Sequence, residues 1–115
     1  MFAMTIAGTK LVDRSKFLAA TGLSERQLDE VLRAKRVFVV RMGGHEFVPR
    51  FFLDERYVKR QLHALCKLLG DLPSGSKLQF FVTPKASLSG RTPLEALLEG
   101  KATAVRRTAE GFLVR

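Results

Sequence analysis

The side chains best suited to catalysis or metal binding are two histidines, His45 and His63, and one cysteine, Cys66. His63 and Cys66 are three residues apart, but two ligands do not make a zinc site. A Cys–His nucleophile needs both side chains in one pocket, and a surface histidine beside a core cysteine explains this spacing more simply. The pair Gly43 and Gly44 lacks the lysine and serine of a phosphate-binding loop. We therefore expect a protein that is not an enzyme and that uses no metal or other cofactor.

Net charge is the unusual property of the composition. Twenty Lys and Arg oppose 11 Asp and Glu, which gives a net charge of +9. This predicts a polyanionic partner: nucleic acid, an anionic membrane surface or an acidic protein. No apolar stretch reaches the length of a membrane span, residues 1–10 lack the pattern of a secretory signal, and a lone cysteine suits a reducing compartment. We expect a cytoplasmic protein without a membrane partner.

Two short helices are predicted near the start of the chain, after residues 1–10, which we expect to form a loose arm or a short edge strand. Residues 13–22 favour a helix that ends at Gly22, where a left-handed residue is needed. Ser24 and Gln27 then form the capping box of a second helix. Its buried stripe is predicted to consist of Leu28, Val31 and Leu32.

A β-hairpin is predicted next, because residues 37–42 and 45–48 are rich in β-branched and aromatic side chains around Gly43-Gly44. Pro49 is expected to end the second strand. The stretch from Gly22 to Pro49 resembles the winged helix-turn-helix of MerR-like and excisionase-like regulators. In these proteins a capped recognition helix is followed by a basic turn, a hairpin with paired glycines and a strand that ends in proline.

The charge pattern of this half agrees with contact to double-stranded DNA. Five cations opposed only by Glu46 give residues 33–50 a net charge of +4, at the helix end and wing where phosphates would lie. Side chains at the start of a recognition helix reach base edges. The residues predicted to contact DNA are Ser24, Arg26, Gln27, Arg33, Lys35, Arg36, Arg41, His45 and Arg50.

The second half is predicted to be helical. We expect Asp54 to cap a helix that runs to about Leu69, with one apolar face and one basic face. Residues 71–77 form the strongest internal break, and a short apolar segment follows at 78–82. The last two helices are predicted to begin at Thr92-Pro93 and at about Ala102. The apolar face of the first helix comprises Val58, Leu62, Leu65, Cys66 and Leu69, and its basic face comprises Arg56, Lys59, Arg60, His63 and Lys67.

Residues 51–112 resemble the C-terminal toxin-binding domain of the Xre/MbcA/ParS antitoxins in three stretches. The first is Leu78-Gln-Phe-Phe-Val-Thr-Pro84, with paired aromatics before Thr-Pro. The second is Ser87-Leu-Ser-Gly-Arg-Thr-Pro-Leu-Glu-Ala-Leu-Leu98, in which Thr-Pro-Leu starts a helix. The third runs from Gly100 to Phe112 and ends in an aromatic residue.

The resemblance implies an antitoxin of a type II toxin–antitoxin system that neutralises a protein toxin of the RES kind, which degrades NAD. It also implies that the chain end lies in or near the active site of the toxin. We expect a mainly α fold with a small β-hairpin: residues 1–50 form a winged helix-turn-helix and residues 51–115 a small helical domain. The residues predicted to contact the toxin are Phe80, Phe81, Arg91, Thr92, Leu94, Phe112, Leu113 and Arg115.

Three hypotheses about function remain open at this point. The first is an antitoxin that also represses its own promoter, and which by analogy with other helix-turn-helix proteins binds DNA as a homodimer. The second is a stand-alone regulator, of phage or chromosomal origin, whose second half only dimerises. The third is an interaction protein whose helix-turn-helix is a scaffold and whose basic charge serves an acidic partner.

Overall fold

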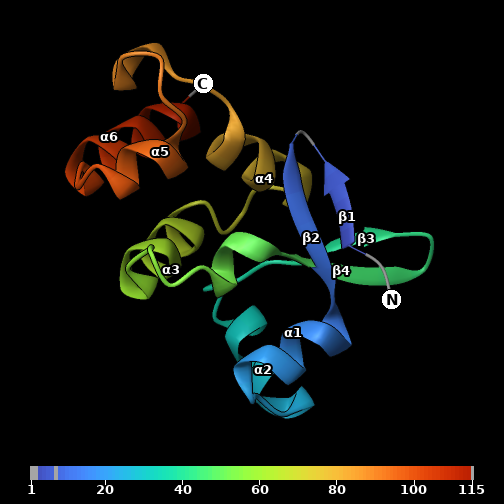
Figure 1. Ribbon diagram of the computed structural model, residues 1–115. Helices are drawn as coiled ribbons and strands as arrows, with labels where there is room; N and C mark the ends of the chain where they lie inside the picture. The colour runs from blue at the N-terminus through green and yellow to red at the C-terminus, as the bar shows by residue number, and fades with distance from the viewer. Residues whose placement is uncertain (1–2, 7, 115) are drawn as a thin grey trace.

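The computed structural model describes residues 3–6 and 8–114, which contain six α-helices and a four-stranded sheet (Figure 1). Two short 3₁₀ helices, η1 and η2, connect the larger elements. The elements in chain order are β1 (Ala3–Ile6), β2 (Thr9–Asp13), α1 (Arg14–Thr21), α2 (Glu25–Arg33), β3 (Val40–Met42), β4 (His45–Pro49), η1 (Arg50–Leu53), α3 (Lys59–Leu68), α4 (Ser74–Val82), η2 (Ala86–Leu88), α5 (Pro93–Leu98) and α6 (Ala102–Leu113).

The sheet is antiparallel with the strand order β1-β2-β4-β3. The predicted hairpin is present as β3 and β4, and Gly43 and Gly44 both have positive φ at its turn. The start of the chain forms the short edge strand that was one of the two expectations, β1, and it contributes a second strand, β2, which pairs with β4 inside the sheet. Residues 9–13 therefore join the predicted hairpin into a larger sheet than the sequence pattern indicated.

Local signals fix the ends of several helices as predicted. The Asp13 carboxylate accepts a hydrogen bond from Lys16 N at the start of α1, and Gly22 closes that helix with φ +75°. Both capping boxes are complete: Ser24 with Gln27 begins α2, and Thr92 with Glu95 begins α5. Each cap satisfies backbone N–H groups that have no partner within the helix.

Three predicted boundaries were wrong. The helix expected from Asp54 begins at Lys59, because the Asp54 carboxylate accepts hydrogen bonds from the backbone and guanidinium of Arg56 and so closes a turn. The expected break at 71–77 is shorter, since α4 begins at Ser74 directly after Pro73. The first strand of the hairpin begins only at Val40, because Phe38 is drawn into the core instead.

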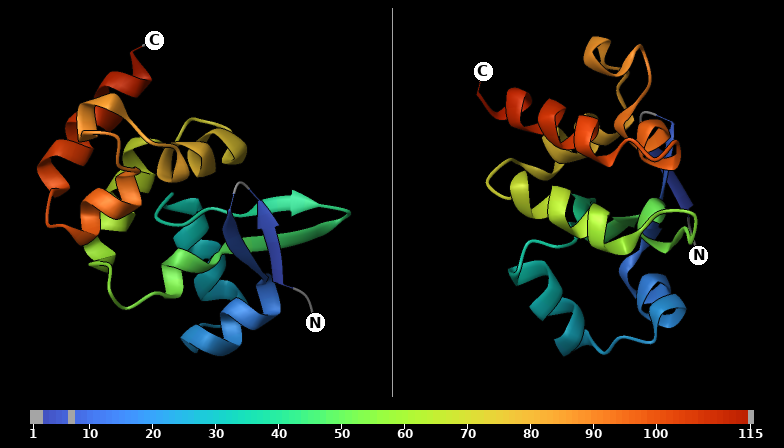
Figure 2. Two further views of the ribbon diagram at one scale, coloured as in Figure 1. Left: turned by 45° about the horizontal axis from the view of Figure 1, so that its top comes forward. Right: turned by 90° about the vertical axis from the view of Figure 1, so that its left-hand side faces the viewer.

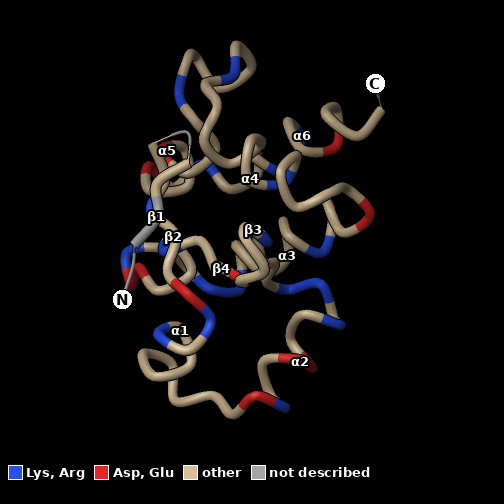
Figure 3. Tube along the Cα trace, turned by 90° about the vertical axis from the view of Figure 1, so that its right-hand side faces the viewer, with Lys and Arg blue, Asp and Glu red and all other residues tan. Residues whose placement is uncertain are grey.

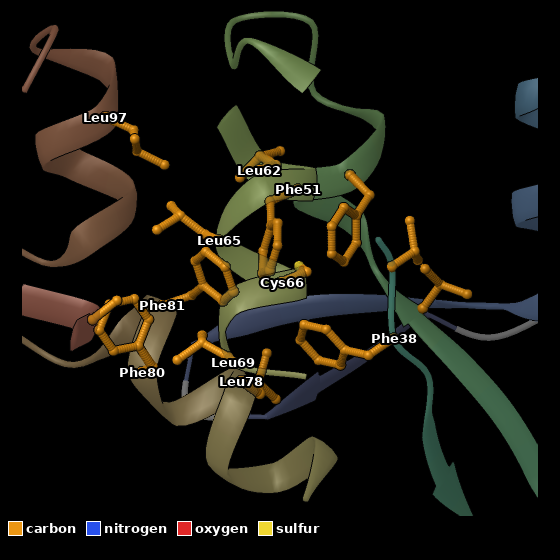
Figure 4. Packing of buried hydrophobic residues seen from close by; sticks show 14 of the residues in the cluster. Phe38, Phe51, Leu62, Leu65, Cys66, Leu69, Leu78, Phe80, Phe81 and Leu97 are labelled. Carbon is orange, nitrogen blue, oxygen red and sulfur yellow. The ribbon is translucent and has the colours of Figure 1, made fainter. Parts of the chain in front are cut away.

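The core is a single cluster to which both halves of the chain contribute. Helix α3 lies between the α1–α2 pair and the α5–α6 pair (Figure 2), with α4 packed against α5. The centre of the cluster is aromatic: Phe81 of α4 packs on Phe51 at 5.1 Å and on Phe38 at 6.4 Å between ring centroids. Figure 4 shows these rings with Leu62, Leu65 and Cys66 of α3 and with Leu69 directly after it, which lie around the same space. Val58, expected on the apolar face of α3, is 49% exposed.

Arg14, at the start of α1, joins three elements through one guanidinium. Its nitrogens donate to Glu25 and Asp29 of α2 at 2.8 Å each and to Glu46 of β4 at 2.9 Å. These charge-assisted bonds raise the pKa of Arg14 well above its ordinary value, with the bond to Asp29 contributing most. Arg14 thereby fixes α2 relative to the hairpin.

Replacing Arg14 with methionine should lower the free energy of unfolding by about 2 kcal/mol. The loss is modest for three hydrogen-bonded ion pairs, because solvent screens the exposed carboxylates. Three clustered carboxylates would then lack their shared cation. Urea denaturation measures the change. The matched control is Arg26→Met on exposed α2 surface, which should shift stability by less than about 0.5 kcal/mol. Equal effects of the two substitutions would contradict the role given to Arg14.

Candidate nucleic-acid interface

Most of the predicted DNA-contacting residues lie on α2, on the turn that follows it and on the β3–β4 hairpin. Two groups of them are described first. Arg33, Lys35 and Arg36 are exposed at the end of α2, where Lys35 pairs with Asp71 and Arg36 lies near His63 of α3. Arg41 and His45 are exposed at the far end, on the β3–β4 hairpin, and Arg41 forms an ion pair with Glu46 at 3.0 Å. The first group therefore lies beside the α3 segment and the second lies on the hairpin.

The start of α2 provides less free hydrogen-bonding capacity than the sequence suggested. The Ser24 hydroxyl accepts from Gln27 N at 3.1 Å, and Gln27 Oε1 accepts from Ser24 N at 2.9 Å, so both side chains serve the helix cap. Arg26 is exposed. Arg50 lies elsewhere, in η1, where it lines a hollow together with Lys10 of β2 and Leu94 of α5.

The turn after α2 is held in a specific conformation. Lys35 adopts a left-handed backbone with φ +61°, uncommon for a residue with a side chain. Lys35 N donates to Leu32 O at 3.0 Å and Arg36 N donates to Val31 O at 3.2 Å, so the turn satisfies carbonyls at the helix end. From this turn the Lys35 side chain reaches Gly70 and Asp71 at the end of the α3 segment, and Arg36 lies near His63.

Two contacts attach the turn to α3. Lys35 Nζ donates to the Asp71 carboxylate at 3.0 Å, and this pairing lowers the pKa of Asp71. The stem of Lys35 crosses Gly70 so closely that a Cβ on residue 70 would lie 2.7 Å from Lys35 Cδ. Gly70 thus marks a close approach as well as the end of the α3 segment.

The exposed face of α3 continues the positive charge. Lys59, Arg60, His63 and Lys67 recur at helical spacing on one side of the helix. His63 is half-buried, and its pKa is lowered by burial and by the charges of Arg36 and Lys59. We name this joined region the basic surface: Arg33, Lys35, Arg36, Lys59, Arg60, His63 and Lys67.

The basic surface holds six permanent cations and is bordered by few carboxylates. Asp71 is paired with Lys35, and Glu30 lies one turn before Arg33 on α2. Figure 3 shows Lys and Arg positions on the segment that directly follows α2, on the side of α3. Glu25 and Asp29, which would repel phosphates, are held by Arg14 near the hairpin. Such a surface can bind a row of phosphates.

The DNA site predicted from the sequence included the turn after α2 but not the basic face of α3. The cations of α3 were visible as a periodic pattern, but their neighbours were not. Lys35 and Asp71 are 36 residues apart, and nothing local in the sequence indicates that they pair.

The predicted toxin-contacting residues have mixed environments. Phe80 and Phe81 are fully buried, so a partner does not reach them in this conformation. Thr92 serves the α5 cap, and Leu94 is half-buried. Arg91 pairs with Glu99.

The end of α6 is, with Arg91, an accessible part of that predicted site. Phe112 packs on Phe80 at 5.3 Å, with Lys85 Nζ 4.8 Å from the Phe112 ring centre. Leu113 and Val114 are exposed at 38% and 82%. Arg115 lies outside the described residues.

Cys66 and His63 do not form a reactive pair. Burial raises the pKa of the Cys66 thiol to about 12, so the thiolate that acts as a nucleophile is scarce at neutral pH. Within residues 3–6 and 8–114, no group of three or more His, Cys, Asp or Glu side chains could hold a metal ion. In the same part of the chain, no helix combines the length and apolar character needed to cross a bilayer. Comparison with family models, curated proteins and solved structures finds no match for this chain.

The lowered pKa of His63 predicts how stability depends on pH. The unfolded chain takes up a proton near pH 6.5, whereas the folded protein takes it up only at lower pH. Between these two values the unfolded state binds more protons, so stability falls as pH decreases below about 6.5.

Substituting His63→Gln should remove the part of the stability loss at low pH that protonation of His63 causes. Urea denaturation of the wild-type protein and of H63Q between pH 5 and 8 measures the difference. An unchanged slope in H63Q would contradict the environment described for His63.

Proposed function

We propose that the protein binds double-stranded DNA through the basic surface and that it is the antitoxin of a type II toxin–antitoxin pair, which represses its own promoter. The observation that carries the DNA part is the convergence of cations from the α2 turn and α3 on one face. The Lys35 side chain crosses Gly70 and pairs with Asp71, and the positive charge of Arg36 contributes to the lowered pKa of His63.

In the proposed binding mode, α2 is the recognition helix of a winged helix-turn-helix and the β3–β4 hairpin is its wing. The exposed Arg26 would reach base edges, while Arg33 and Arg36 would contact the phosphates of one strand. Lys59 and Arg60 of α3 would extend the row of phosphate contacts. The Arg14 cluster agrees with this arrangement, because Arg14 pairs with Glu25, Asp29 and Glu46 and so offsets part of the negative charge beside the wing.

The antitoxin part of the proposal rests on the resemblance to the Xre/MbcA/ParS antitoxins. Its proposed contacts are the accessible ones: Arg91 beside α5, and the end of α6 at Leu113 and Val114. A RES-type toxin acts on a dinucleotide, and a basic chain end suits a site that handles phosphates.

Charge reversal of the turn tests the DNA proposal. The triple variant Arg33→Glu, Lys35→Glu, Arg36→Glu should weaken binding to the DNA upstream of its own gene by at least about 100-fold near 0.1 M salt. It should also make the slope of log Kd against log salt shallower by an amount that corresponds to about two phosphate contacts, those of Arg33 and Arg36. Fluorescence anisotropy across a salt series gives both quantities.

The matched control is Lys101→Glu, Arg106→Glu, Arg107→Glu on α6, which changes the net charge equally at exposed positions outside the basic surface. It should retain most of the wild-type affinity and the wild-type salt slope. Equal losses in both triple variants would show that only overall charge matters and would overturn the placement of the interface.

A further inference from the structure

A second face of α3 lies beside an open groove that the DNA proposal does not use. The groove runs between α3 and α6 and has a volume of about 500 Å³. Its base is apolar, with Leu65 and Leu97 almost fully buried and Leu68 partly exposed. We name it the α3–α6 groove.

The helices that border the groove carry small residues where another helix could approach. Ala64 of α3 is exposed, and Ala102 of α6 is half-buried. Small side chains allow close packing of a further helix into the space between two others. An amphipathic helix bound in this way would place leucine-type side chains at i, i+3, i+4 and i+7 on the apolar base.

The rim of the groove is positive. Lys67 and Arg106 line it from opposite helices, and none of its lining residues is a carboxylate. Arg106 has one ion pair, to Glu110 at 3.6 Å, which is exposed and longer than a direct hydrogen bond. A partner carboxylate can therefore replace Glu110 at little cost.

From the apolar base, the small residues and the positive rim, we propose that the α3–α6 groove binds an acidic amphipathic helix of a partner protein. A second copy of this chain fits less well, because each copy has a net charge of +9 and would bring further cations to the rim. The inference rests on the proposed function only in that the protein has a protein partner.

The test uses a synthetic helical peptide with leucines at i, i+3, i+4 and i+7 and glutamates on its polar face. A second peptide has lysines in place of the glutamates. Binding is measured by fluorescence anisotropy, and a ¹H–¹⁵N titration of the full chain maps the contact. The acidic peptide should bind at micromolar concentration and shift residues of α3 and α6, and the lysine peptide should bind at least about tenfold more weakly.

Two variants separate the groove from general charge. The double variant Lys67→Glu, Arg106→Glu should bind the acidic peptide about tenfold or more weakly than the wild type. The double variant Lys101→Glu, Arg107→Glu should keep the wild-type affinity for this peptide. Ala64→Trp should fill the groove and abolish binding without a change in net charge. Circular dichroism of each variant confirms that it is folded.

Several results would overturn the inference. They are no binding of the acidic peptide, equal binding of both peptides, or binding that survives A64W. Self-association that A64W abolishes, without peptide binding, would instead assign the groove to a second copy. The peptide assay needs neither toxin nor DNA. Failure of the groove proposal is therefore distinguishable from failure of the antitoxin proposal, which toxin neutralisation tests.

Discussion

Contact among phenylalanines determines how the two halves of this protein fit together. Phe38 follows α2, Phe51 and Phe52 follow the sheet, and Phe81 comes from α4, and all four rings lie within 6.5 Å of a neighbouring ring centre. Large aromatic side chains contribute much of the free energy of a small core. Because the cluster draws from both halves, α3 is held between them and its orientation is fixed.

The orientation of α3 gives this one helix three different neighbours. Its apolar side, with Leu62 and Cys66, faces the core. A second side presents Lys59, Arg60 and His63 beside the α2 turn, and a third borders the groove to α6. Lys67 lies where the basic surface meets the groove. The two proposed binding surfaces are therefore adjacent and share Lys67.

Features of the sequence that act locally predicted the structure well. The caps at Ser24 and Thr92, the stop at Gly22 and the turn at Gly43-Gly44 each satisfy backbone groups within a few residues, and each is present. Features that depend on distant partners were missed. Phe38 left the strand for the core, and β2 paired with β4. The error at Asp54 had a local cause, because its carboxylate pairs with Arg56, two residues further on, instead of capping α3.

The candidate site follows the same division. Arg33, Lys35 and Arg36 were predicted from charge and position alone, and they lie together at the end of α2. Their proximity to α3 could not be predicted, because it depends on the Lys35–Asp71 pair and on the missing side chain at Gly70. The link from Arg14 to Glu25, Asp29 and Glu46 was equally hidden, although it changes the interpretation of the acidic residues on α2.

Co-expression with the product of the adjacent gene tests the proposed role most directly. Growth, cellular NAD and co-purification are followed for the neighbour alone, for this protein alone and for the pair. The proposal predicts that the neighbour alone arrests growth and depletes NAD, and that the pair grows normally and purifies as a stable complex. A harmless neighbour that forms no complex would contradict the antitoxin role and would favour a stand-alone DNA-binding regulator.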